Sequence, residues 1–304
     1  MDRYLNPFTD FGFKKLFGDE NNKDLLIDFL NEVIRSKDQI KDLTFRKTEH
    51  LGSTETDRKA IFDLYCENEE GEKFIIELQK IKQSFFKDRS LYYATFPIQE
   101  QAERGNWDYQ LKAVYTVGIL DFVFDEDKHE VDKLLYEIKL MDTERKRVFY
   151  DKLTFYYLEM PKFRKKEEEL ETHFDKWLYV LRYLPYLQSC PVKLQEKIFQ
   201  KVFAIAEMAK FTPQERHAYE DSLKYYRDLR NSLDTAKEEG WKEGRKEGKK
   251  EGKKEGRKEG IQIGEEKGLQ KGKLEMAKVM KDNGESIEKI QQYTRLSRKQ
   301  IEDL

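Results

Sequence analysis

Two carboxylates and an amide interrupt a segment that is otherwise apolar on both sides of a turn. The segment is KAIFDLYCENEEGEKFIIELQK, residues 59–80, and the interrupting residues are Asp63, Glu77 and Gln79. Apolar residues before and after Gly71 predict two strands joined in a short hairpin, with side chains alternating between the two faces. The question is why a hairpin with so much apolar surface carries three polar side chains.

The spacing predicts which residues face each other across the hairpin. If the loop is centred near Glu70 and no bulge intervenes, Asp63 lies opposite Glu77, and Ile61 lies opposite Gln79. Like charges that are directly opposite destabilise a sheet, although a solvated strand face could tolerate them. Apolar residues on both faces favour instead a central hairpin that is covered on both sides, which makes a buried acid pair costly unless a cation neutralises it.

Such a pair of acids is suited to a hard divalent cation. We expect Asp63, Glu77 and the backbone carbonyl of Leu78 to hold Mg²⁺, or Mn²⁺ in its place, with positions left open for water. An ion held in this way lowers the pKa of a bound water and stabilises charge on a phosphate. Gln79 would position the water but supplies no charge, so Lys59 on the Asp63 face, or Arg58, is expected to provide the cation.

The flanking sequence predicts a mixed α/β core that is followed by helices. Residues 21–34 have apolar side chains at helical spacing, and a helix over residues 83–105 is expected to kink or divide at Pro97. Besides the hairpin, strands are expected over residues 43–45, 111–124, 135–141 and 153–159. Residues 167–233 are helical in pattern.

A glycine at every fourth position marks the next segment, from Gly240 to Gly272. Each glycine costs a helix roughly 0.8–1 kcal/mol relative to alanine, so an isolated helix is expected to be weak. Basic residues outnumber acidic ones by nine to four between Lys242 and Lys258. The sequence leaves three possible roles for this segment: a plain linker, an arm that contacts DNA phosphates, and a stripe through which copies of the chain associate.

The remaining C-terminal residues, 274–304, predict a small helical module in which Ser297 caps the last helix. Two interpretations stay open, a helix-turn-helix that contacts DNA and a capping bundle that does not. We expect four parts of the chain: a core over residues 1–160, a helical region over 161–235, the glycine repeat over 236–273 as linker or helix, and the small helical module over 274–304.

Composition excludes several classes of protein. The 304 residues carry a formal net charge of −2, so any surface for nucleic acid must be a local patch. Cys66 and Cys190 have no metal-binding spacing and are expected to be reduced. No apolar signal region and no run of about 18 apolar residues occurs, which predicts a cytoplasmic protein without a membrane span. The sequence does not select between a monomer and a homo-oligomer.

The hairpin resembles the D…(D/E)xK core of the PD-(D/E)XK nuclease superfamily in its residues IFDLYC…FIIELQ. The stretches NPFTDFGFKKLFG and KDRSLYYATFPIQEQ, together with the glycine repeat, resemble the PD-(D/E)XK nuclease family transposases from Asn6 to about Lys273. The resemblance implies a restriction-endonuclease-like mixed sheet and Mg²⁺-dependent DNA endonuclease activity. It also implies that Asp63 and Glu77 bind the metal, and that Gln79 replaces the superfamily's lysine.

Two further basic residues are candidates for phosphate binding. Lys14 could approach a phosphate or be an ordinary surface lysine. Arg89, which follows Phe85 and Phe86 on the helix after the hairpin, could hold a phosphate or pair with a core carboxylate. Arg89 is also the second choice, after Lys59, for the missing cation. The alternative function is a non-enzymatic DNA-binding or scaffold protein with a decayed nuclease core.

Overall fold

A computed structural model describes residues 2–36, 39–50, 60–102 and 107–304, which form two compact units, Met1–Arg230 and Asn231–Leu304. The strands are β1 (Leu43–Phe45), β2 (Glu49–His50), β3 (Ala60–Ile61), β4 (Leu64–Asn68), β5 (Lys73–Gln79), β6 (Val114–Leu120), β7 (Leu135–Asp142) and β8 (Arg147–Glu159). The helices are α1 (Asp10–Phe17), α2 (Lys23–Ile34), α3 (Phe86–Gln99), α4 (His173–Tyr183), α5 (Lys197–Ala206), α6 (Pro213–Asp282), α7 (Ile287–Thr294) and α8 (Arg298–Glu302).

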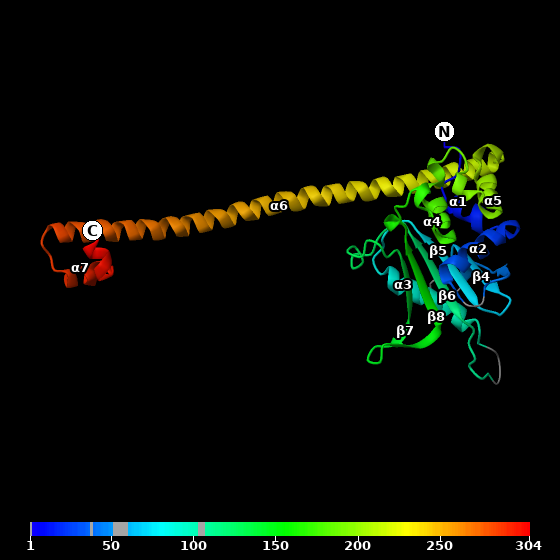
Figure 1. Cartoon of the computed structure of the whole chain (residues 1–304), viewed down its shortest axis with the longest axis horizontal. Helices are drawn as coiled ribbons and strands as arrows, with labels where there is room; N and C mark the ends of the chain where they lie inside the picture. The colour runs from blue at the N-terminus through cyan, green and yellow to red at the C-terminus, as the bar shows by residue number, and fades with distance from the viewer. Residues whose placement is uncertain (1, 37–38, 51–59, 103–106) are drawn as a thin grey trace. The chain divides into compact units, whose positions relative to one another are not determined.

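Six strands form the main sheet in the order β1-β4-β5-β6-β8-β7 (Figure 1). The central strands β5, β6 and β8 are parallel, and the remaining pairs are antiparallel. The hairpin of β4 and β5 pairs Leu64 with Ile76 and Glu67 with Lys73, which confirms the register expected from a loop centred near Glu70. The sheet is therefore the mixed sheet that the sequence predicts.

The expected first strand of the hairpin is wrong at its amino-terminal end. Ile61 belongs to β3, which pairs with β2 in a separate two-stranded sheet, so it lies opposite Glu49 and not opposite Gln79. The chain bends at Phe62 and Asp63 before β4 begins. The bend turns Phe62 away from the face of Leu64, and its ring packs within 5.5 Å of Tyr65 instead. The strand alternation alone does not reveal this break.

Helices cover both faces of the main sheet. The face of Ile76 and Val117 packs into one large core with α1, α2, α4 and α5, in which Trp177 of α4 contacts Phe29 of α2 and Phe199 of α5. The opposite face packs against α3, whose Pro97 lies inside the helix without dividing it. Since α4 and α5 share the core of the sheet, the helical region is part of the same unit.

The start of α6 belongs to this first unit. Tyr219 and Tyr226 are buried, and the Tyr219 hydroxyl accepts a hydrogen bond of 2.9 Å from the backbone N–H of Asn6. Further along, α6 contains the glycine repeat. A Cβ atom built on any of the nine glycines from Gly240 to Gly272 would meet nothing within 4 Å. The glycines therefore serve no packing need within the described residues.

The second unit ends in a small helical module. Gly284 turns the chain after α6 with φ +77°, a backbone conformation that favours glycine. Ser286 caps α7 and Ser297 caps α8, the latter as the sequence predicts. A separate cluster of buried side chains holds the module together, namely Ala277, Ile290, Leu296 and Ile301. In the portion of the chain that the structure describes, no helix has the length and apolarity that crossing a bilayer requires.

Two truncations test which part of α6 stabilises the first unit. A chain that ends at Glu238 keeps Tyr219 and Tyr226 and should unfold thermally at nearly the wild-type temperature. A chain that ends at Thr212 loses both buried rings, each worth about 1.5–3 kcal/mol, and should be less stable by several kcal/mol. Calorimetry of the two truncated proteins makes the comparison. Equal destabilisation by both truncations would show that the repeat and the C-terminal module stabilise the core.

Candidate active site

The carboxyl ends of the three parallel strands meet at one edge of the sheet. In-register pairing aligns Gln79 of β5 with Leu120 of β6 and Glu159 of β8. In open α/β sheets, ligands bind outside the carboxyl ends of the strands. Glu77 and Gln79 lie among the last three residues of β5, so the sequence candidates reach the edge where a site is expected.

Asp63 contacts β5 from the bend between β3 and β4. Its Oδ2 accepts a hydrogen bond of 2.7 Å from the backbone N–H of Leu78. The backbone N–H of Asp63 in turn donates to the Glu77 carboxylate. This exchange holds the two acids beside each other, one residue beyond the paired Leu64 and Ile76.

Burial makes both carboxylates hard to ionise. Burial raises the pKa of Asp63, and burial followed by the charge of Asp63 raises the pKa of Glu77 to about 8. Glu77 Oε1 is buried and has no hydrogen-bond partner among the described residues. A buried, unpartnered carboxylate oxygen next to a second acid is an environment that a divalent cation would neutralise.

The donor set for such a cation is small. Among the described residues, no three His, Cys, Asp or Glu side chains come close enough to one another to bind a metal together. Asp63 and Glu77 would therefore need oxygen ligands of other kinds. Backbone carbonyls such as that of Leu78, and water, are the other ligands that Mg²⁺ accepts.

Gln79 is buried and held at both ends of its amide. Its Oε1 accepts a hydrogen bond from Nη2 of Arg89, and its Nε2 donates to the carbonyl of Ile81 at 2.8 Å. The Arg89 guanidinium also lies over the rings of Phe86 and Tyr93, 5.5 Å and 5.8 Å from their centroids. The Arg89 guanidinium on α3 thus reaches Gln79, two residues after Glu77, and its charge offsets part of the rise that burial and Asp63 cause in the pKa of Glu77.

Comparison with known proteins identifies the family. A family sequence model described as PD-(D/E)XK nuclease family transposase matches residues 7–236. The chain belongs to this family. No curated protein and no solved structure gives a significant match. The family match confirms the resemblance seen in the hairpin and its flanks, although the matched segment ends before the glycine repeat.

Membership gives the fold and the broad function together. The six-stranded mixed sheet with helices on both faces agrees with the restriction-endonuclease-like fold expected for this PD-(D/E)XK chain. The family implies a nuclease-type function, and PD-(D/E)XK nucleases generally use divalent metals and act on DNA. Gln79 stands where the PD-(D/E)XK superfamily signature has a lysine.

Of the three remaining basic residues that the sequence suggests for the site, the structure describes only Lys14. Arg58 and Lys59 lie outside the described residues. Lys14 forms an ion pair of 3.1 Å with Asp10 on α1, and its charge offsets a small part of the rise that burial causes in the pKa of Asp63 and of Glu77. Lys14 is therefore close to the acid pair as well as partly exposed.

Sequence reasoning missed two residues at the same edge. Lys80 directly follows Gln79, and its partial burial lowers the pKa of its ammonium. Asp121 follows β6, and its backbone N–H donates to the carbonyl of Gln79 at 2.9 Å. Burial raises the pKa of Asp121, whose carboxylate accepts a hydrogen bond of 2.9 Å from Tyr226. The one signal in the sequence was the position of Asp121 at the end of an apolar strand.

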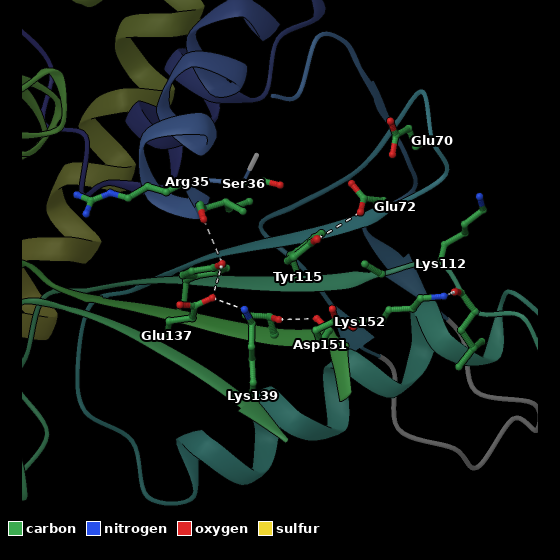
Figure 2. A pocket seen from close by; sticks show the side chains of 15 residues that line it. Arg35, Ser36, Glu70, Glu72, Lys112, Tyr115, Glu137, Lys139, Asp151 and Lys152 are labelled. Carbon is green, nitrogen blue, oxygen red and sulfur yellow. Dashed lines mark hydrogen bonds and ion pairs between the residues drawn. The ribbon is translucent and has the colours of Figure 1, made fainter. Parts of the chain in front are cut away.

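A separate polar pocket of about 480 Å³ lies near the amino ends of the same parallel strands (Figure 2). Its polar groups largely bind each other. The Tyr115 hydroxyl donates to Glu72 at 3.3 Å, while Lys139 and the Tyr156 hydroxyl both contact Glu137. Because these groups satisfy one another far along the strands from Gln79, we assign the pocket no part in the chemistry.

The raised pKa of Glu77 gives a pH dependence of stability in metal-free solution. Between its usual value of 4.5 and about 8, folded protein retains a proton that unfolded chain releases. Stability should therefore fall as pH rises from about 5 to about 8, by at most about 1.4 kcal/mol per pH unit.

Urea unfolding of wild type and of Glu77→Gln in EDTA measures this slope. The amide cannot ionise, so the variant should lose most of the slope, while the exposed Glu220→Gln control keeps it. A Glu77→Gln variant with the wild-type slope would contradict the assignment.

Proposed function

We propose that the protein is a divalent-metal-dependent DNA endonuclease that hydrolyses phosphodiester bonds. Mg²⁺ is the expected ion and Mn²⁺ a substitute, and promotion of recombination or transposition in the cytoplasm is the proposed setting. The observation that carries the proposal is the unpartnered, buried Oε1 of Glu77 beside Asp63, in a chain of a nuclease family.

The two acids and Leu78 are proposed to hold the cation. The hydrogen bond from Leu78 fixes Asp63 Oδ2, and the backbone of Asp63 fixes the Glu77 carboxylate, so both side chains are preorganised. A bound divalent cation would lower the pKa of a water and stabilise charge on the phosphate. Without it, the raised pKa of Glu77 favours the protonated form near neutral pH.

Gln79 and Arg89 are proposed to share the role of the superfamily's lysine. A lysine can both orient the attacking water and stabilise negative charge on the phosphate. Gln79 Oε1 has a second lone pair with which it can orient a water. Arg89 supplies the charge, since its guanidinium donates to that same oxygen. Arg58, Lys59 and Lys14 remain proposed phosphate contacts of the surroundings.

A non-enzymatic DNA-binding or scaffold protein is the second candidate. One observation favours it, namely the amide at Gln79 in place of an ammonium. In this case Asp63 and Glu77 would be remnants that bind no ion, and DNA would bind without being cut.

Plasmid nicking separates the two candidates. Purified protein should nick supercoiled plasmid with Mg²⁺, and EDTA should stop the reaction. Asp63→Asn keeps an oxygen that accepts from Leu78 but removes the charge that binds the ion, so nicking should fall to background. Asp151→Asn, at the far end of the strands, should cut normally. Cleavage that survives in Asp63→Asn, or no cleavage by wild type, would reject the enzyme.

A second set of variants tests the origin of the positive charge. Arg89→Ala should lower the nicking rate by about 10²–10³, the usual cost of removing one positioned donor. Gln79→Lys should restore part of the rate in the Arg89→Ala background, because it returns an ammonium to this position. Lys87→Ala is the control, since Lys87 lies on the same helix and is paired with Glu126.

Lys59→Ala, measured at saturating Mg²⁺ alongside these variants, tests the other candidate. A large loss in Lys59→Ala with a normal rate in Arg89→Ala would place the cation on the strand side. Normal rates in both would show that the site needs no substitute cation.

A further inference from the structure

Phe85 is an aromatic residue exposed at the edge of the proposed site. Its side chain is 79% exposed, and its backbone has φ 62° and ψ 26° at the residue before α3. Bulky side chains rarely adopt this left-handed conformation, and such strain persists where the surroundings enforce it. Here Phe86 is buried and packs 5.7 Å from the ring of Tyr157, which leaves Phe85 directed to solvent.

The backbone of Phe85 is hydrogen-bonded to the backbone of Arg89, whose side chain is a cation of the site. The carbonyl of Phe85 accepts a hydrogen bond of 2.9 Å from the backbone N–H of Arg89, one helical turn later. The guanidinium of Arg89 donates to Gln79. Phe85 is thus one turn from the group that we propose to contact the scissile phosphate.

Tyr225 repeats this arrangement on α6. Its ring is 62% exposed, and Nζ of Lys80 lies 5.6 Å from the ring centroid. The neighbouring Tyr226 is buried and donates to Asp121. Two pairs of adjacent aromatic residues therefore each combine a buried anchor with an exposed ring. The Tyr225 ring lies beside the Lys80 ammonium, and in the other pair it is the buried Phe86 over which the Arg89 guanidinium lies.

We propose that Phe85 and Tyr225 stack on unpaired bases, so that the substrate is single-stranded or locally unpaired DNA. Proteins that bind single strands combine aromatic stacking platforms with cations that contact the backbone. In a duplex the base faces are already stacked on each other, and a protruding ring can reach them only by unstacking a base step, which costs a few kcal/mol. Unpaired bases offer their faces without this cost, so the rings favour a single strand. This inference rests on the proposed endonuclease function and specifies its substrate.

Binding measured in EDTA tests the inference without cleavage. The probes are a fluorescein-labelled oligothymidylate of about 20 nucleotides, longer than one binding groove covers, and a duplex of equal length. By fluorescence anisotropy, wild type should prefer the single strand. Phe85→Ala and Tyr225→Ala should each weaken single-strand binding by about 5- to 150-fold, the range for losing one stacked base, with little effect on duplex binding.

Two exposed aromatic residues elsewhere are the matched controls. Phe149 is 80% exposed and precedes Leu153, at the end of β8 that lies away from the site, and Tyr186 is 77% exposed between α4 and α5. Their alanine variants should bind both probes as wild type does. Phe85→Trp keeps a ring and should retain single-strand binding.

Phe85→Gly is the control that separates loss of the ring from misfolding. Glycine accepts the positive φ without strain, so this variant should unfold at or above the wild-type temperature and still lose single-strand binding. Wild-type affinity in both Phe85→Ala and Phe85→Gly, or equal losses on single strand and duplex, would overturn the inference.

Plasmid nicking distinguishes the failure of this inference from that of the proposed function. Mg²⁺-dependent nicking with unchanged single-strand affinity in the Phe85 and Tyr225 variants refutes the inference alone. Stacking-dependent binding without any cleavage supports the inference as a binding property and rejects the endonuclease.

Discussion

The hydrogen bond from the Leu78 amide to the Asp63 carboxylate determines how the site is built. It joins the bend that ends the β4 ladder to the neighbouring strand β5. At this bend the chain passes from the small β2–β3 sheet into the main sheet, and the hydrogen bond keeps the acid at the carboxyl end of β5. The carboxylate is thereby kept beside Glu77, whose pKa is raised first by burial and then by the charge of Asp63.

The other polar residues at this edge of the sheet gather around Gln79, next to the two acids. The parallel register of β5, β6 and β8 brings Asp121 to the backbone of Gln79, and Lys80 follows it toward α6. On the other face, α3 delivers Arg89 to the Gln79 amide. The bend before β4 and the end of β5 supply Asp63 and Glu77, while α3 and the residue after β5 supply the cations Arg89 and Lys80.

The sequence predicted what depends on local alternation and missed what depends on tertiary packing. The hairpin register followed from the turn at Gly71 and from the apolar pattern, and the structure has the same pairing of Leu64 with Ile76. The break at Phe62 and Asp63 did not follow, because a bend changes no residue type. Lys80 and Asp121 were missed since only the parallel pairing of β5 with β6 brings them together.

The contact between Arg89 and Gln79 is a second case in which tertiary packing was not predictable from the sequence. Reasoning from strand parity ranked Lys59 above Arg89, because a residue on the same strand as Asp63 appeared nearer than one on a later helix. Packing of α3 against the sheet places the Arg89 guanidinium on Gln79, while Lys59 lies outside the described residues, so its ranking stays a prediction. Distances along the sequence carry no information about such a contact.

Phe85, the residue that precedes α3, has a consequence for how the protein can be switched. A hydrocarbon ring offers no acceptor to the free amides of the first helical turn, so this turn lacks the cap that usually holds a helix start. Arg89 belongs to that turn. Opening of the turn alone would withdraw the guanidinium from Gln79 while leaving the acids and the sheet intact. If the protein is the proposed endonuclease, its activity would then be lost on heating at a temperature below that at which the whole protein unfolds.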